Sequence, residues 1–92
     1  MKISWILWIQ EYEDKIAAKH GVDRDEVAEV LYGRMVIRRA GKGKVKGEDL
    51  YMGLGQTDDG RYLVVFFILK TGNVAMPVSA RDMTTAERRQ YE

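Results

Sequence analysis

The feature that most constrains this chain is an apolar run near its middle, "RYLVVFFILK" at residues 61–70. Branched and aromatic residues fill it almost without interruption, which is typical of a β-strand buried on both faces. The turn-forming sequence "DDG" precedes the run and "TGN" follows it. We therefore expect a central strand whose antiparallel neighbours are joined to it by short turns.

Further strands are expected on either side of this run. The stretches "LYMGLGQT" (50–57) and "VAMPVSAR" (74–81) have strand character, and "RMVIRR" (34–39) alternates weakly. Pro77 has no backbone N–H to donate, so it indicates either an edge position or a bulge in its strand. The glycine- and lysine-rich stretch 40–49 is expected to be a loop.

Helices are expected at both ends of the chain. Residues 11–21 have a helical pattern, and Asp23 with Glu26 forms a capping box for a helix over 22–33. The apolar stretch 3–9 does not distinguish a strand from the lead-in to a helix.

A second capping box opens a short C-terminal helix, with Thr84 and Glu87 three residues apart. The predicted fold is therefore α+β: a small antiparallel β-sheet with two N-terminal helices and one C-terminal helix packed on it. The 92 residues fit a single domain spanning residues 1–92.

The amino-acid composition limits the kinds of site that this chain can form. The chain has no cysteine and one histidine, His20, so we expect no disulfide and no metal site. We also expect no cofactor. The absence of disulfides fits a cytoplasmic protein. No apolar run approaches the roughly 20 residues of a membrane span, and the first residues lack a signal-peptide cleavage pattern.

The net charge of +1 hides a basic segment. Residues 34–47 hold six Lys/Arg and no acidic residue. Such a segment is either a solvated basic hairpin, which charge alone favours, or a contact for an anionic partner.

Three arginines form a candidate anion site. Arg61 opens the central strand and Arg81 closes the next one, so an antiparallel pairing brings both to the same edge of the sheet. Arg88 lies one turn into the helix that follows. Together they can hold a phosphate through bidentate hydrogen bonds. The alternative is that Arg61 and Arg81 form structural salt bridges with nearby acidic residues, namely Asp58, Asp59 or Asp82.

Aromatic residues beside such arginines suit single-stranded RNA, which is bound by stacking and phosphate contact. Trp8 and Tyr91 are the candidates, whereas Phe66 and Phe67 are expected in the core. His20, next to Lys19 at a helix end, is either a capping or packing residue or a general base.

Three blocks resemble the BrnT family of bacterial type II toxins: "AKHGVDRDEVAEVLYG", "YMGLGQTDDGRYLVVFF" and "VSARDMTTAERRQYE". Their order and spacing match over roughly residues 8–92. The resemblance implies a RelE-like fold and an endoribonuclease activity that arrests growth. The implied partner is an antitoxin of the ribbon-helix-helix type, and operator DNA is bound only through the toxin–antitoxin complex.

The resemblance also implies which residues act on RNA. The catalytic candidates are Arg61, Arg81, Arg88, Lys19 and His20. The substrate-binding candidates are Trp8 and Tyr91, together with a loop longer than the family's usual hairpin that carries Lys42, Lys44 and Lys46.

RNA cleavage by its own 2′-hydroxyl requires a held phosphate, stabilised negative charge and proton transfer, but no metal. The arginines supply the first two. No histidine is expected at the arginine cluster itself. Either Lys19, His20 or Tyr91 contributes to proton transfer, or the enzyme relies mainly on positioning and charge.

The first helix departs from the commoner family pattern. Many members have an aspartate directly after the tryptophan, then a lysine and an asparagine, where this chain has Ile9, Tyr12 and Ile16. This favours an alternative: a catalytically inactive BrnT-like domain that binds an antitoxin or RNA. A third possibility is an interaction domain whose arginines are all salt-bridged.

Overall fold

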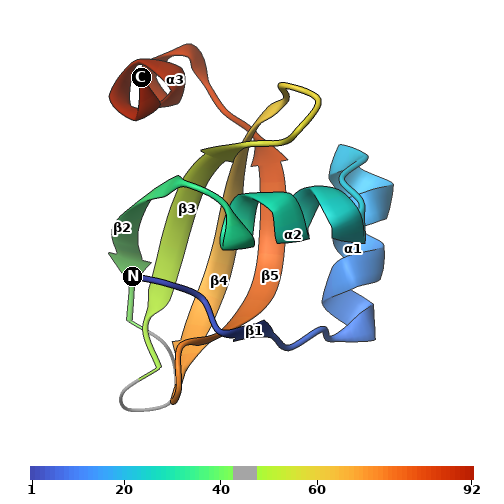
Figure 1. Cartoon of the computed structure of the whole chain (residues 1–92). Helices are drawn as coiled ribbons and strands as arrows, with labels where there is room; N and C mark the ends of the chain where they lie inside the picture. The colour runs from blue at the N-terminus through green and yellow to red at the C-terminus, as the bar shows by residue number, and fades with distance from the viewer. Residues whose placement is uncertain (43–47) are drawn as a thin grey trace.

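The computed structural model describes residues 1–42 and 48–92. Its elements are β1 (Trp5–Ile6), α1 (Gln10–His20), α2 (Arg24–Tyr32), β2 (Met35–Gly41), β3 (Leu50–Gln56), β4 (Tyr62–Lys70), β5 (Val74–Asp82) and α3 (Thr85–Tyr91) (Figure 1). The candidates Lys44 and Lys46 lie outside the described residues.

The strands form one sheet in the order β1-β5-β4-β3-β2, with β4 in the middle as predicted. Strands β2 to β5 pair with one another in antiparallel fashion. The short β1 pairs with the start of β5 in parallel, through Trp5 opposite Val74 and Ile6 opposite Ala75. The ambiguous stretch 3–9 therefore contains a strand, and α1 begins directly after it.

Pro77 lies at a bulge between β4 and β5. Phe66 faces Ser79 and Phe67 faces Pro77, so Val78 is an extra residue in β5. β1 pairs with β5 only at residues 74–75, so the outer edge of β5 is not hydrogen-bonded to β1 at Pro77. The missing N–H is thus accommodated, and the predicted bulge is confirmed.

One face of the sheet forms the main core with α1 and α2. Leu63, Val65 and Phe67 alternate along β4 and are fully buried there. The apolar residues Val27, Val30 and Leu31 of α2 pack into the same core. α2 begins at the predicted capping box. α2 packs against β3 and β4, whereas α1 lies along β5 (Figure 1).

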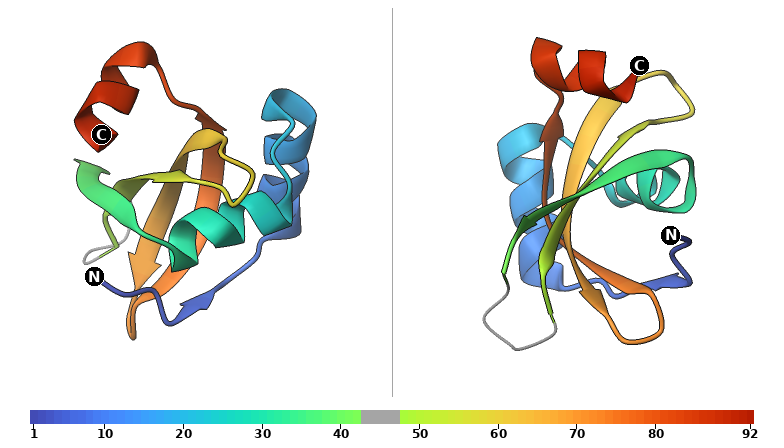
Figure 2. Two further views of the ribbon diagram at one scale, coloured as in Figure 1. Left: turned by 45° about the horizontal axis from the view of Figure 1, so that its top comes forward. Right: turned by 90° about the vertical axis from the view of Figure 1, so that its left-hand side faces the viewer.

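The opposite face carries the intervening residues of β4. Of these, Val64 is fully buried, whereas Tyr62, Phe66 and Ile68 are partly exposed. α3 begins at the second predicted capping box and lies beyond one end of the sheet (Figure 2). Its Tyr91 packs against Tyr62, so α3 contacts this second face at that end. The predicted α+β architecture, with two N-terminal helices and one C-terminal helix, is confirmed.

Candidate functional site

Four segments meet at the α3 end of the sheet: the end of α1, the beginning of β4, the end of β5, and α3 itself (Figure 1). Leu63 pairs with Asp82, so the start of β4 lies next to the end of β5. The predicted proximity of the backbone at Arg61 and Arg81 is therefore confirmed.

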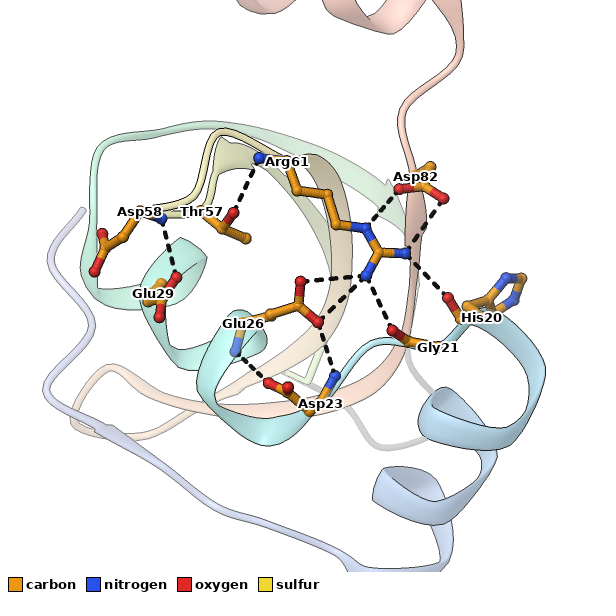
Figure 3. A network of polar contacts seen from close by, with 9 residues as sticks. All are labelled: His20, Gly21, Asp23, Glu26, Glu29, Thr57, Asp58, Arg61 and Asp82. Atoms are coloured by element: carbon orange, nitrogen blue, oxygen red, sulfur yellow. Dashed lines mark hydrogen bonds and ion pairs between the residues drawn. The ribbon is translucent and has the colours of Figure 1, made fainter.

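Arg61 is held on all sides by protein acceptors (Figure 3). Its Nε and Nη2 donate to the Asp82 carboxylate at 2.8 and 3.3 Å. Its Nη2 also donates to the His20 carbonyl at 3.1 Å, and its Nη1 to the Gly21 carbonyl at 2.9 Å. Nη1 lies 3.2 Å from both Glu26 carboxylate oxygens. Arg61 thus ties the end of α1, the start of α2 and the end of β5 together, and it satisfies two carbonyls at a helix end.

His20 lies at this Arg61 network, although no histidine was expected beside the arginines. Gly21 adopts a left-handed conformation with φ of 62° and ends α1, which places His20 beside Asp82 (Figure 3). The pKa of the Asp82 carboxyl is lowered chiefly by the hydrogen bond from Arg61, and further by the charges of Arg61 and His20. His20 is partly buried, whereas Lys19 is exposed.

The side chains of Arg81 and Arg61 project from opposite faces of the sheet. Neighbouring residues of a strand alternate between faces, so Asp82 reaches Arg61 while Arg81 lies over the ring of Phe66, 5.4 Å from its centroid. Phe66, expected in the core, is only partly buried on this face. The three arginines therefore do not form one cluster.

Arg81 is paired with Glu87 of α3. Its two terminal nitrogens donate to the two Glu87 oxygens at 2.7 and 2.9 Å. This hydrogen bonding is the main reason why the pKa of Glu87 falls from 4.5 to about 2. The Arg81 side chain remains 33% exposed and that of Glu87 15% exposed. The paired hydrogen bonds have the geometry with which arginine also binds phosphate.

Arg88 and Tyr91 lie on the same side of the sheet as Arg81. The Arg88 guanidinium carbon is 4.0 Å from the centroid of the Tyr62 ring, a cation–π contact. Tyr91 meets Tyr62 edge to face, with 6.0 Å between ring centroids. Arg88 also lies 3.6 Å from Glu92, with both side chains about half exposed. This side therefore combines exposed cations with aromatic rings.

Trp8 and Lys42 lie away from the arginines. The Arg24 guanidinium carbon is 4.7 Å from the centroid of the Trp8 ring, and Trp8 packs against the core. Arg24 is fixed by Glu13, with its Nη2 2.7 Å from a carboxylate oxygen. Lys42 is exposed just beyond β2, which ends at the end of the sheet remote from α3 (Figure 1).

The salt-bridge alternative is right for Arg61, which pairs with Asp82. For Arg81 the carboxylate partner is Glu87, which the sequence reasoning missed. The available signal was the capping box, because an N3 glutamate turns its carboxylate back toward the residues that precede the helix. Asp58 uses its backbone N–H to bond Glu29 instead.

In the described part of the chain, no three histidine or acidic residues are grouped closely enough to hold a metal ion. Within residues 1–42 and 48–92, no helix has the length and apolar character that a membrane crossing requires.

The fold is that of a small α+β protein with one mostly antiparallel sheet. The α3 end of this sheet carries arginines beside aromatic rings. The family described as "Ribonuclease toxin, BrnT, of type II toxin-antitoxin system" matches residues 8–87. The match covers most of the chain, and the chain belongs to the BrnT family of ribonuclease toxins. Membership in a type II family implies an antitoxin partner.

Among solved structures, the chain is similar to the Brucella abortus ribonuclease toxin, BrnT, with a TM-score of 0.61. The two sequences are 19% identical over 88% of this chain and 97% of the other. At this level of sequence identity, the structural similarity shows that the two chains share a fold. No curated protein sequence matches the chain.

Proposed function

We propose that this chain is a cytoplasmic endoribonuclease toxin that cleaves RNA without a metal, and that Arg81 holds the scissile phosphate. The observation that carries the proposal is the Arg81–Glu87 pair. It presents a bidentate guanidinium next to an aromatic ring, at a partly exposed position. The proposed partner is a ribbon-helix-helix antitoxin, through which alone the chain reaches operator DNA.

In the first step, an RNA phosphate replaces the Glu87 carboxylate on Arg81. Both anions offer two oxygens to the guanidinium, so the exchange conserves the charge-assisted hydrogen bonds. Glu87 keeps a second partner, the backbone N–H of Thr84 at 2.8 Å, so α3 retains part of its cap. Arg88, exposed on the same helix, supplies a second positive charge.

In the second step, the 2′-hydroxyl oxygen attacks the adjacent phosphorus and the bond from phosphorus to the 5′-oxygen breaks. The products are a 2′,3′-cyclic phosphate and a free 5′-hydroxyl. A base takes the 2′-hydroxyl proton and an acid protonates the leaving 5′-oxygen, so no metal or external reactant is consumed. Arg81 and Arg88 stabilise the negative charge that develops on the phosphate oxygens.

Tyr91 lies on the same side of the sheet as Arg81 and is the first proposed proton carrier. Lys19 and His20 are the other two proposed carriers, and RNA held on Arg81 must extend around the end of the sheet to reach them. His20 and Lys19 lie at the end of α1, which Arg61 fixes by bonding the His20 and Gly21 carbonyls. We therefore assign Arg61 a positioning role.

The remaining RNA contacts are proposed from the family likeness. Tyr91 lies beside Arg88 and is the best placed of the substrate-binding candidates. Trp8 and Lys42 would meet only RNA that extends beyond the α3 end of the sheet. Lys44 and Lys46 belong to the same basic loop.

The test is expression of the chain in bacteria, alone and as Arg81→Ala, with growth and total RNA followed over time. Arrest with RNA degradation, relieved by Arg81→Ala, supports the proposal. Arg89→Ala is the matched control, because it removes the same charge from an exposed position of α3. Co-expression of the antitoxin should restore growth. Arrest that persists in a folded Arg81→Ala variant would refute the role of Arg81.

A second candidate function is a catalytically inactive module that binds the antitoxin or RNA. It is favoured by the carboxylates on Arg61 and Arg81, since both guanidinium groups are already paired within the chain. Normal growth and intact RNA, together with retained antitoxin binding, would identify this function.

A further inference from the structure

A cavity of about 400 Å³ lies between α3 and the beginning of β2. It is lined by Arg34, Met35, Val36 and Tyr91. This volume is in the range of small-ligand sites. None of the roles assigned to Arg81 and Glu87 uses this cavity.

The aromatic wall of the cavity is held in place from behind. Tyr91 packs edge to face on Tyr62, at an interplanar angle of 80°. Tyr62 is in turn contacted by the Arg88 guanidinium at 4.0 Å. Val36 is partly buried and gives the cavity an aliphatic side, whereas the Met35 side chain packs against the main core on the other face of the sheet. The cavity therefore combines a supported aromatic ring with an aliphatic side chain.

Arg34 gives the cavity a positive charge. It is exposed, and no carboxylate of the described residues lies within ion-pair distance of it. Arg61 and Arg81, in contrast, are each paired with carboxylates. An anion can thus reach Arg34 without displacing a protein group.

We propose that this cavity binds one unpaired nucleotide of single-stranded RNA, with the base against Tyr91 and Val36 and a phosphate on Arg34. The choice of RNA as ligand rests on the proposed function. An aromatic ring beside a guanidinium is the combination with which proteins hold unstacked bases and the backbone between them. An acidic peptide would use Arg34 but would gain little from the flat face of Tyr91. Bases in a duplex cannot enter, so the cavity selects single strands.

The experiment measures binding separately from cleavage. The probe is a fluorescent tetranucleotide with 2′-fluoro riboses, which lacks the attacking hydroxyl and so cannot be cut. Its affinity for the full chain is measured by anisotropy over a range of salt concentrations. The variants are Arg34→Ala, Tyr91→Leu and Tyr91→Phe. Lys15→Ala is the control, since Lys15 is an exposed cation on α1 and does not line the cavity.

We expect Arg34→Ala to weaken binding and to reduce the slope of log affinity against log salt by about 0.7, the value for one phosphate contact on a single strand. Tyr91→Leu should weaken binding about 5- to 100-fold through lost stacking, with the salt slope unchanged. Tyr91→Phe and Lys15→Ala should bind like the unaltered chain.

The proposal is overturned if the probe does not bind, or if Arg34→Ala and Tyr91→Leu bind it as the unaltered chain does. Tyr91→Leu can loosen α3, so the Arg34→Ala salt slope, at an exposed position, decides in that case. A parallel incubation with ordinary RNA separates the two proposals. Probe binding that depends on Arg34, without any cleavage of ordinary RNA, would refute the ribonuclease function and leave the nucleotide site standing.

Discussion

Arg81 and Glu87 are joined by two hydrogen bonds, at 2.7 and 2.9 Å, across the start of α3. The same Glu87 carboxylate accepts the Thr84 backbone N–H at 2.8 Å and so completes the cap of α3. One carboxylate thus fixes the last helix and covers the arginine that we propose for phosphate binding. The order of α3 and the availability of Arg81 are therefore physically linked.

Stability should depend on pH through Glu87. Its pKa falls from 4.5 to about 2 on folding, chiefly because Arg81 donates to it. A lowered pKa stabilises the fold above the unfolded value, and that stabilisation is lost as pH falls from about 5 to about 2. Glu87→Gln should cost on the order of 2 kcal/mol at pH 7 and should flatten this pH dependence. Urea unfolding at pH 7, 4 and 2.5 measures both effects.

The matched control for Glu87 is Glu11→Gln. Glu11 makes an exposed helix pair with Lys15 at 3.4 Å, so its loss should change the unfolding free energy by about 0.5 kcal/mol or less. Equal pH dependence in Glu87→Gln and the unaltered chain would show that the Arg81–Glu87 pair does not stabilise the fold.

Arg61 should be essential for stability. Arg61→Ala leaves the His20 and Gly21 carbonyls and two carboxylates without their shared donor, so we expect a loss of about 2–4 kcal/mol in unfolding free energy. Arg61→Lys should recover only part of it, because a lysine lacks the planar fork. Thermal and urea unfolding, with Arg89→Ala as an exposed control, test this. A midpoint unchanged in Arg61→Ala would contradict the positioning role.

Gly55 should tolerate no side chain. A Cβ there would lie 2.9 Å from Val30 Cγ1, on the α2 side of β3, and 3.5 Å from the Arg34 carbonyl oxygen. Gly55→Ala should therefore destabilise the chain by about 1–3 kcal/mol. At Gly41 a Cβ meets no described atom within 4 Å, so Gly41→Ala serves as the control in urea unfolding. Equal midpoints for the two variants would mean that α2 does not pack closely on β3.

The fold was predictable where local signals are strong. Each capping box starts its helix at the expected residue, and the apolar run at 61–70 is the central strand. The family likeness and the ribonuclease toxin family were likewise predicted from sequence blocks and confirmed. These features depend on residues close together in the sequence.

The site was harder to predict because it depends on which way side chains leave the sheet. Arg61 and Arg81 are adjacent in the fold, yet the alternation along β5 sends Asp82 to one face and Arg81 to the other. The bulge at Val78 lies between the turn that joins β4 to β5 and Arg81, and it shifts the register by one residue. Residues of β5 after the bulge, including Arg81, therefore lie on the face opposite to the one that an unbroken pairing would give them. Arg34 belongs to no recognisable sequence motif. It is identified as a candidate binding residue because it lines the cavity between α3 and β2.

The most direct test of the central claim is incubation of the purified chain with single-stranded RNA in excess chelator, with product ends read by mass spectrometry. We predict cleavage that yields 2′,3′-cyclic phosphate and 5′-hydroxyl ends, slowed about 100-fold or more in a folded Arg81→Ala variant. RNA left intact by the folded, unaltered chain, or equal rates for Arg81→Ala, would contradict the account.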